Sequence, residues 1–270
     1  MVVEENRLSF ESPYVRRCRR ACPRHRLVCL PHAGAGATSY AEWPGLLPPD
    51  VELVVVQLPG REDRLGEPAF TDVPALLRTA AQVLRPYLRP PFSVFGHSGG
   101  ALFAYELARA LAARSAHQPA HLFLSGQAAP DRTGEVPALH ALPDDEFVEA
   151  VTAIGGTTPA VLADPQLREV VLPALRADFT LWERYRFVPG PALAMPFTVF
   201  GGDRDERAPL ATLRGWAAHT NGEFDLQVLD GAHFYLQERR AEVAGVIAAK
   251  LAGAQVAPEP VAPGAGSAGA

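Results

Sequence analysis

This chain of 270 residues has little lysine, little cysteine and no long apolar run. Lys250 is the only lysine among 25 basic residues, and alanine is abundant, which we attribute to GC-rich coding. The three cysteines, at positions 18, 22 and 29, are odd in number and lack a second ligand pair, which excludes a disulfide framework and a zinc site. Without about 18 consecutive apolar residues, a membrane-spanning helix is also excluded.

An excess of positive charge is missing too. The chain carries 25 basic and 30 acidic residues, a formal net charge of −5, which argues against a nucleic-acid partner. The first residues include Glu4 and Glu5 and lack the apolar core of a secretory signal. We therefore expect a soluble, cytoplasmic monomer that binds no metal and no cofactor and does not associate with membranes.

The length and apolar content suit one domain with a sizeable core, since 48% of the residues are hydrophobic. Strand-like and helix-like segments alternate through residues 51–125. This alternation predicts an α/β domain with a mostly parallel central sheet and helices on both faces. We expect this domain over residues 14–252, preceded by a loose stretch, residues 1–13. Residues 253–270, rich in alanine, proline and glycine, are expected to form a disordered tail.

The most informative stretch is residues 92–101, Phe-Ser-Val-Phe-Gly-His-Ser-Gly-Gly-Ala. An apolar, β-prone run ends at Gly96 and helix-forming residues follow, so Ser98 lies at a sharp strand-to-helix turn. This context fits the Gly-x-Ser-x-Gly nucleophile elbow of α/β-hydrolases, in which small neighbours permit a strained serine backbone. The alternative is an ordinary serine cap in a glycine-rich turn. We interpret Ser98 as a nucleophile.

A serine hydroxyl needs a base, which follows the nucleophile in the α/β-hydrolase order. Of eight histidines, only His219 and His233 lie far enough downstream. His219 falls in a helical stretch, residues 210–221, and is interpreted as a residue at the end of that helix. His233 lies on a short glycine-containing loop after the strand-like segment 224–229, where it can reach the elbow. His233 is the predicted base.

The acid that orients the base is expected on the loop after the preceding strand-like segment, residues 196–200. Asp203, Asp205 and Glu206 compete for this role. Asp203 directly follows a glycine and can brace the turn by accepting backbone hydrogen bonds. Asp205 lies further out, where its carboxylate can approach the histidine loop. We predict Asp205 as the acid and Glu206 as a solvated neighbour.

A tetrahedral intermediate needs two backbone N–H donors for its oxyanion. Gly99, the residue after the nucleophile, is expected to supply one, and Ala33, on a loop of small residues after segment 26–30, the other. Gly34 and Gly36 on that loop raise the alternative of a phosphate-binding loop. Because it lacks both a Lys-Ser/Thr ending and the Gly-x-Gly-x-x-Gly spacing, we do not expect a nucleotide site.

The segment between residues 125 and 196 is unusually long. About 70 residues separate the two strand-like segments, far more than a normal connection in an α/β unit. Residues 144–153 and 167–185 have apolar side chains at helical spacing. An ordinary helical insertion packed on the sheet is one interpretation. We predict instead a helical lid over the active site, at about residues 137–187.

Arginines are concentrated near the N-terminus, at positions 16, 17, 19, 20, 24 and 26. Such a cluster normally forms a solvated face, and a partner site is the alternative. We return below to this group as the basic cluster.

Longer motifs accompany the elbow. They are residues 27–34 (Leu-Val-Cys-Leu-Pro-His-Ala-Gly), 57–64 (Gln-Leu-Pro-Gly-Arg-Glu-Asp-Arg), Tyr14 to Arg17, Asp178-Phe179 with Glu183 and Tyr185, 202–205 and 231–236. Together they resemble the stand-alone type II thioesterases that serve polyketide synthases and nonribosomal peptide synthetases. The resemblance spans about residues 14–250, and the first two motifs are much more specific than Gly-x-Ser-x-Gly.

The resemblance implies an α/β-hydrolase fold with Ser98 as nucleophile, Asp205 as acid, His233 as base, and Ala33 and Gly99 as oxyanion donors. It implies hydrolysis of acyl groups from the phosphopantetheine arm of acyl or peptidyl carrier proteins, which clears stalled or wrongly loaded synthases. The basic cluster, Arg61 and Arg64 are then candidates for docking an acidic carrier protein, although Arg61 is equally suited to bracing the fold.

One position departs from the family. Members usually have methionine after the serine, and this chain has Gly99. We therefore expect a side chain that walls the acyl pocket to be missing, which bears on acyl preference and not on the reaction. The alternatives to a thioesterase are a carboxylesterase or lipase-like hydrolase, a chain-releasing cyclase, and a non-catalytic binding protein with a hydrolase fold.

Overall fold

The structure is a computed structural model, and it describes residues 6–89, 91–114, 117–135, 138–157 and 159–253. Residues 1–5 of the stretch expected to be loose, residues 254–270 of the expected tail, and residue 137 at the start of the expected lid lie outside the described residues.

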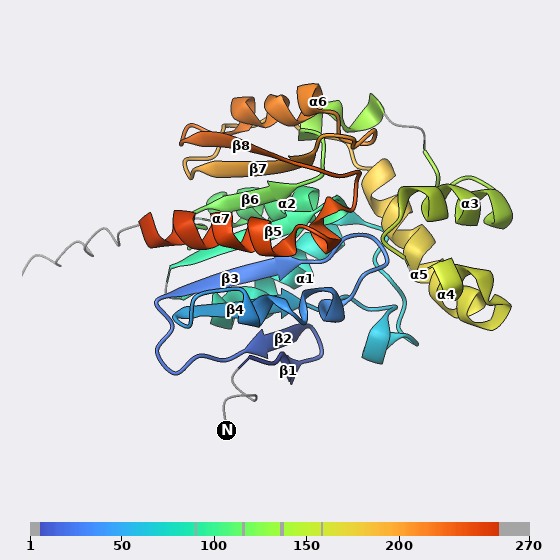
Figure 1. Cartoon of the computed structure of the whole chain (residues 1–270), viewed down its shortest axis with the longest axis horizontal. Coiled ribbons are helices and arrows are strands. Elements are labelled where there is room, and N and C mark those ends of the chain that lie inside the picture. Colours follow the sequence, from blue (N-terminus) through green and yellow to red (C-terminus); the bar gives the residue numbers. More distant parts are fainter. Residues whose placement is uncertain (1–5, 90, 115–116, 136–137, 158, 254–270) are drawn as a thin grey trace, which may run out of the picture.

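The described residues form an eight-stranded sheet in the order β1-β2-β4-β3-β5-β6-β7-β8 (Figure 1). The strands are β1 (Ser9–Ser12), β2 (Val15–Cys18), β3 (His25–Leu30), β4 (Val51–Val56), β5 (Phe92–His97), β6 (Leu122–Ser125), β7 (Phe197–Gly202) and β8 (Phe224–Leu229). Strands β1 and β2 pair antiparallel, as do β2 and β4, and every other pairing is parallel. The predicted fold class, a mostly parallel α/β-hydrolase sheet, is confirmed.

Helices cover both faces of this sheet. The α-helices are α1 (Val73–Leu84), α2 (Gly99–Ala112), α3 (Asp144–Ile154), α4 (Pro159–Ala163), α5 (Pro165–Glu183), α6 (Leu210–Arg214) and α7 (Arg240–Gly253). Short 3-10 helices are η1 (Ala37–Tyr40), η2 (Trp43–Gly45), η3 (Glu62–Arg64), η4 (Arg85–Tyr87), η5 (Pro130–Glu135), η6 (Gly215–His219) and η7 (Tyr235–Gln237). In Figure 1, α7 lies in front of the sheet and α1 and α2 lie behind it.

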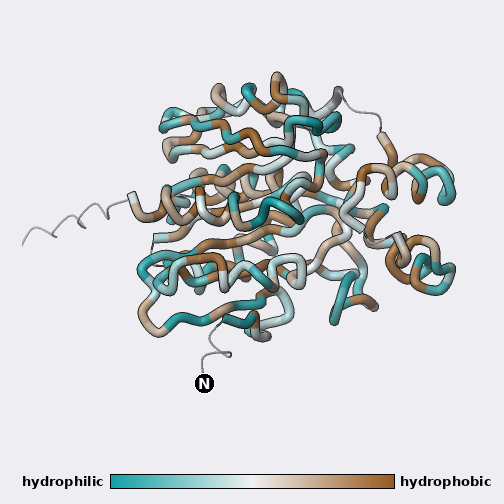
Figure 2. The backbone as a smooth tube through the Cα atoms, in the orientation of Figure 1, coloured by the Kyte–Doolittle hydropathy of each residue, from teal (hydrophilic) through white to brown (hydrophobic). Residues whose placement is uncertain are grey.

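The central strands are mostly apolar because helices cover both faces of the sheet there. Val28 and Leu30 of β3 pack into the core with α1 and α2, whereas Leu27 and Cys29 pack into the opposite core with α7. Alternate residues of a strand point to opposite faces, so a strand between two helical layers has apolar residues at most positions and not only at every second one. Figure 2 shows the resulting apolar stretches along the central strands.

Strand β1 corrects the expectation of a loose N-terminal stretch for residues 9–12. Ser9–Ser12 pair with β2, and β2 in turn pairs with β4. Phe10 of β1 is 64% exposed. Backbone hydrogen bonds to β2, and not burial of apolar side chains, therefore attach this strand to the sheet edge. An edge strand of this kind has no apolar alternation, which is why the sequence pattern does not reveal it.

The basic cluster is paired internally along this edge of the sheet. Arg17 and Arg26 both bind Glu52, whose carboxylate is fully buried between them. Further ion pairs in the cluster join Arg16 with Asp63, Arg17 and Arg19 with Glu11, and Arg24 with Asp50. Most of this positive charge is therefore matched by carboxylates of the same chain, which favours a solvated face over a partner site.

Helices α3, α4 and α5 form an insertion between β6 and β7, at the end of the sheet where the parallel strands finish (Figure 1). They share a small apolar cluster that includes Phe147, Leu162 and Leu175. The long helix α5 begins cleanly because the Asp164 side chain accepts hydrogen bonds from two N–H groups of its first turn. The helical segments expected at residues 144–153 and 167–185 are present as α3 and α5.

Candidate active site

Ser98 lies at a strained turn between β5 and α2. Its φ is 54° and its ψ is −128°, a backbone conformation that residues other than glycine rarely adopt. A Cβ on Gly96 would overlap the Gly100 carbonyl, and a Cβ on Gly100 would overlap the Leu30 carbonyl. The turn therefore requires glycine at both positions, and it presents Ser98 at the N-terminus of α2.

The three residues Ser98, His233 and Asp205 form one hydrogen-bonded chain. Nε2 of His233 lies 3.0 Å from Ser98 Oγ, and Nδ1 lies 2.9 Å from Asp205 Oδ2. An ionised carboxylate can only accept hydrogen bonds, so Nδ1 carries the proton and Nε2 is free to accept from the serine hydroxyl. This is the arrangement that allows a histidine to take a proton from serine.

Asp205 is held for this task by its own loop. Its Oδ1 accepts hydrogen bonds from the backbone N–H groups of Arg207 and Ala208, at 2.9 and 3.1 Å. Burial by itself raises the pKa of the Asp205 carboxyl, but the hydrogen bond and charge of His233 and the two N–H donors outweigh burial, and the pKa lies below its ordinary value. The carboxylate is therefore ionised beside the imidazole.

The competing residues have other partners. Asp203 Oδ1 accepts the Gly231 N–H at 2.9 Å and so joins the loop after β7 to the loop after β8. Glu206 is exposed. His219 lies between the Tyr105 hydroxyl, at 3.2 Å, and the Asp131 carboxylate, at 3.0 Å, and does not contact Ser98. Of these candidates, His233 is the one hydrogen-bonded to Ser98, and Asp205 is the acid hydrogen-bonded to His233.

Ala33 and Gly99 lie beside Ser98 at one small cavity of about 70 Å³. Gly99 is the first residue of α2, so its N–H has no partner within the helix. Ala33 lies on the loop after β3, where Gly34 has a φ of 76°. The loop and the helix N-terminus thus bring two backbone segments to the same cavity as the serine hydroxyl.

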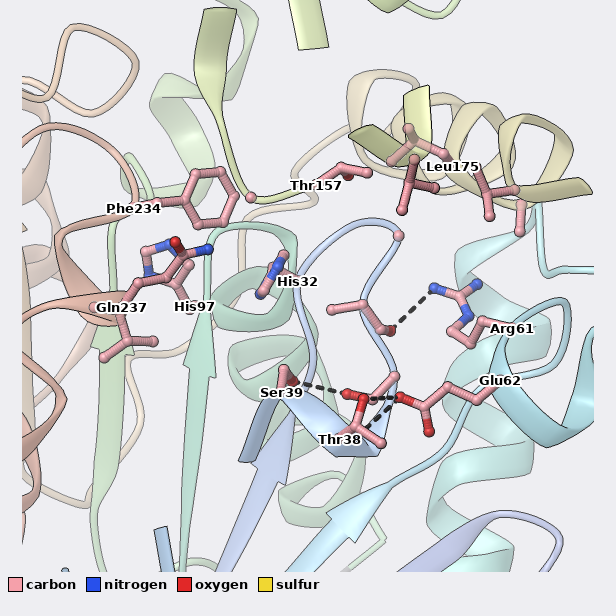
Figure 3. A pocket seen from close by; sticks show the side chains of 18 of the residues that line it. His32, Thr38, Ser39, Arg61, Glu62, His97, Thr157, Leu175, Phe234 and Gln237 are labelled. Carbon is pink, nitrogen blue, oxygen red and sulfur yellow. Dashed lines mark hydrogen bonds between the residues drawn. The ribbon is translucent and has the colours of Figure 1, made fainter. Parts of the chain in front are cut away.

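The loop after β3 is fastened by an ion pair that sequence reasoning did not identify. Asp178 of α5 accepts the Gly34 N–H at 2.7 Å and pairs with Arg61 at 2.5 Å. Glu62 accepts the Thr38 N–H at 3.0 Å (Figure 3). Carboxylates from two other segments of the chain therefore accept backbone N–H groups of residues 34 and 38.

Two larger hollows adjoin the small cavity. One, of about 460 Å³, is lined by His32, Arg61 and Gln237 and shares Thr157, Leu175 and Phe234 with the small cavity (Figure 3). The Phe234 ring lies against three histidine rings, with centroid distances of 4.9 Å to His32, 5.3 Å to His97 and 5.1 Å to His233. Phe234 therefore stands between this outer hollow and the serine.

The second hollow, of about 620 Å³, opens on the other side and is lined by Leu102, Tyr185 and Phe187 together with Ser98 and His233. The serine and histidine are thus accessible from the α2 side, while the first hollow approaches them from the side of the loop after β3. Ser98 therefore lines the small cavity and this second hollow, and the first hollow adjoins the small cavity at Phe234.

His97 was not singled out by the sequence as a functional residue. Its Nδ1 lies 2.9 Å from Ser125 Oγ, and burial, with smaller effects of the neighbouring His233 and His32, holds its pKa well below the ordinary value. Burial likewise lowers the pKa of His32 to about 4. Both imidazoles are therefore neutral near pH 7 and add no positive charge beside His233.

Arg207 and Trp182 are two further residues at the site that the sequence did not assign. Both line the small cavity and the hollow on the α2 side. Burial lowers the pKa of Arg207, and its guanidinium lies 6.0 Å from the centre of the Phe179 ring. Nothing in the sequence identifies these two residues as part of the site, because neither belongs to a catalytic motif. Only their position in the tertiary structure does.

Within the described ranges, no group of three or more His, Cys, Asp or Glu side chains is arranged to hold a metal ion. In the same part of the chain, none of the helices combines the length and apolar character needed to cross a bilayer. None of the cysteines in the described part of the chain forms a disulfide; Cys18 and Cys29 are buried and Cys22 is exposed.

The chain is similar in sequence to a family of known proteins. Residues 25–251 match the thioesterase domain family. The chain is 36% identical over 218 residues to the gramicidin S biosynthesis protein GrsT of Aneurinibacillus migulanus, which covers 81% of this chain and 85% of that protein. It is 37% identical over 235 residues to the thioesterase PikA5 of Streptomyces venezuelae, which covers 87% and 83%.

A solved structure gives the same result. The type II thioesterase BorB from the borrelidin biosynthetic cluster superposes with a TM-score of 0.83 at 37% identity, covering 90% of this chain and 99% of that one. The match to the family extends over most of the residues that build the sheet, the insertion and the serine turn. The chain belongs to the thioesterase domain family.

Proposed function

We propose that this protein is a serine thioesterase that hydrolyses acyl groups from the phosphopantetheine arm of acyl or peptidyl carrier proteins. Family membership supports thioester hydrolysis. The observation that carries the proposed chemistry is the hydrogen-bonded chain from Ser98 through His233 to Asp205. Relatives that act in gramicidin S biosynthesis and the borrelidin cluster support an editing role, in which the enzyme clears stalled or wrongly loaded acyl groups.

In the acylation step, Ser98 Oγ bonds to the thioester carbonyl carbon while its proton passes to Nε2 of His233. The carbonyl oxygen becomes an oxyanion and accepts hydrogen bonds from the Ala33 and Gly99 N–H groups. Asp205 accepts the Nδ1–H bond and stabilises the imidazolium. The carbon–sulfur bond then breaks, the pantetheine sulfur takes the proton from Nε2, and an acyl-enzyme remains on Ser98.

Deacylation repeats these steps with water. A water molecule gives a proton to Nε2 of His233 as its oxygen attacks the acyl carbon, and the same two N–H groups stabilise the second oxyanion. The bond to Ser98 Oγ then breaks, Oγ regains the proton from His233, and a carboxylic acid leaves. No oxidant, reductant or cofactor is needed for either step.

The proposed substrate accounts for the space around Ser98, which lines the small cavity and the hollow on the α2 side, with the other hollow beyond Phe234. A phosphopantetheine arm is long and thin, so a carrier protein can stay outside while the thioester reaches inward. We propose that α3, α4 and α5 act as a lid over this path. Support comes from α5, whose side chains line both hollows and the small cavity between them.

The test is turnover of one acyl group on three leaving groups: acyl-carrier protein, the matching acyl-CoA, and the matching p-nitrophenyl ester. The proposal expects the highest kcat/KM with the carrier protein, and expects kcat/KM for that substrate alone to fall with salt. Ser98→Ala is the control for background hydrolysis. Preference for the p-nitrophenyl ester, with no salt effect, would favour the carboxylesterase interpretation.

A fluorophosphonate probe addresses the non-catalytic alternative, since it labels only an activated serine. The proposal expects stoichiometric labelling of Ser98 in the native protein and none in His233→Ala. A native protein that failed to label would instead support a binding protein with a hydrolase fold.

A further inference from the structure

The indole of Trp182 occupies the position that a side chain on Gly99 would take. A Cβ built on Gly99 would lie 2.6 Å from Trp182 Nε1 and 3.1 Å from Cγ, and it would be closer still to Cδ1. Carbon atoms in favourable contact are about 3.5–4.0 Å apart. The backbone directly after Ser98 can therefore carry no side chain while this indole is in place.

Trp182 is held there by aromatic neighbours. Its ring packs against Phe103 of α2 and against Tyr185, with centroid distances of 6.2 and 6.3 Å. The Tyr185 hydroxyl donates a 2.6 Å hydrogen bond to Glu106 of α2. This bond fixes the Tyr185 ring against which the indole packs. The indole, which extends from α5, is thus fixed by contacts with α2 and with Tyr185.

The indole also divides the space beside the serine. It lines the cavity of about 70 Å³ that contains Ala33, Ser98 and Gly99, and it lines the hollow of about 620 Å³ on the α2 side. An apolar cavity of roughly 150 Å³ holds one molecule of benzene. A cavity half that size has room for a short acyl group, and a longer chain would have to pass the indole.

We propose that Trp182 determines the acyl-chain length that this enzyme accepts, and that it restricts the small cavity to short groups such as acetyl and propionyl. This inference rests on the proposed thioesterase function. It corrects the expectation that the pocket lacks a wall at position 99: α5 supplies the wall, and Gly99 makes space for it.

The first test compares acetyl-, butyryl-, hexanoyl- and octanoyl-CoA as substrates of the native protein and of Trp182→Ala. Each methylene group in an apolar pocket changes kcat/KM by about 10-fold or more when it no longer fits. The ratio of octanoyl to acetyl kcat/KM is therefore expected to rise at least about tenfold in Trp182→Ala. Leu181→Ala is the matched control, since Leu181 is a buried neighbour on α5 that does not line the cavity at Ser98.

The second test examines the contact itself. Gly99→Met should lower both activity and melting temperature in the native background, because the new side chain collides with the indole. In the Trp182→Ala background the methionine has space, so Gly99→Met should restore the preference for short chains and part of the melting temperature. If Gly99→Met lowered activity and melting temperature equally in both backgrounds, the proposed contact would be overturned, since the effects of substitutions at two contacting residues are not additive.

Two outcomes separate this inference from the function on which it rests. A native protein that hydrolyses none of the thioesters refutes both. A native protein that hydrolyses them, with the same chain-length ratio as Trp182→Ala, refutes only the role of Trp182. If Trp182→Ala does not fold, Trp182→Leu replaces it, and rates of Ser98 labelling by methyl and octyl fluorophosphonates give the same comparison without turnover.

Discussion

Arg61 and Asp178 form a buried ion pair that joins the loop after β4 to the insertion helix α5. Their side chains are each 5% exposed, and two guanidinium nitrogens reach the carboxylate at 2.5 and 3.0 Å. The same carboxylate accepts the N–H of Gly34 at 2.7 Å. One side chain on α5 therefore fastens the loop that contains the predicted oxyanion donor Ala33, and Arg61 braces the fold instead of facing a carrier protein.

Removing the Asp178 carboxylate should lower both the unfolding free energy and the rate of thioester turnover. Asp178→Ala leaves a buried guanidinium without its partner, which is expected to cost about 3–5 kcal/mol of unfolding free energy. Denaturant unfolding measures this cost, and thioester turnover should fall as the Ala33 loop loosens. Asp145→Ala is the control, because the Asp145 side chain is 89% exposed in its pair with Arg168 and should leave both quantities almost unchanged. Equal effects of the two substitutions would contradict the bracing role.

Ser98→Ala, His233→Ala and the double variant should lose similar activity, on the order of 10⁴–10⁶-fold in kcat, since the members of such a triad act as a unit. Circular dichroism should show that all three remain folded. His219→Ala should retain far more activity than His233→Ala, because His219 is hydrogen-bonded to Tyr105 and Asp131, away from the serine. A near-normal rate in His233→Ala would exclude it as the base.

The two aspartates after β7 should differ sharply in purified, folded variants. Asp205→Asn places an amide beside Nδ1 of His233 and favours the wrong tautomer, so a loss on the order of 10⁴-fold in kcat is expected. Asp203→Asn weakens the hydrogen bond to Gly231 and should mainly lower the melting temperature. Should Asp203→Asn prove the more damaging to kcat, the assignment of the acid would be reversed.

Buried histidines should make the fold sensitive to mild acid. Burial lowers the pKa of His25 and of His121 to about 4, and their rings are hydrogen-bonded to Ser93 and Thr198. Between about pH 6.5 and 4, the unfolded chain binds protons that the folded chain does not, so stability falls as pH falls, by about 1.4 kcal/mol per pH unit for each histidine.

Urea unfolding across this range measures the slope. His121→Asn can keep a hydrogen bond to Thr198 and removes one titrating group, so its slope should be smaller by about 1.4 kcal/mol per pH unit than that of the native protein. An identical slope in the variant would show that His121 is protonated in the folded state as readily as in the unfolded state.

The sequence by itself determined the class of fold and the order of the functional residues. Both depend on short-range patterns: apolar strands between helices, small residues around Ser98, and a histidine on a glycine loop after the last strand. Such patterns are set by local backbone sterics and by burial on both faces of a sheet, so they can be read along the chain. The expected segment 224–229 coincides with β8 (Phe224–Leu229).

Tertiary structure decided what depends on contacts between distant segments. It paired Arg61 with Asp178, matched most of the basic cluster with carboxylates, and added β1 at an exposed edge. It also set Trp182 over Gly99, residues 83 positions apart. Nothing along the chain encodes these pairings as a pattern, because each is selected by shape and charge only after the sheet and α5 have brought the partners together.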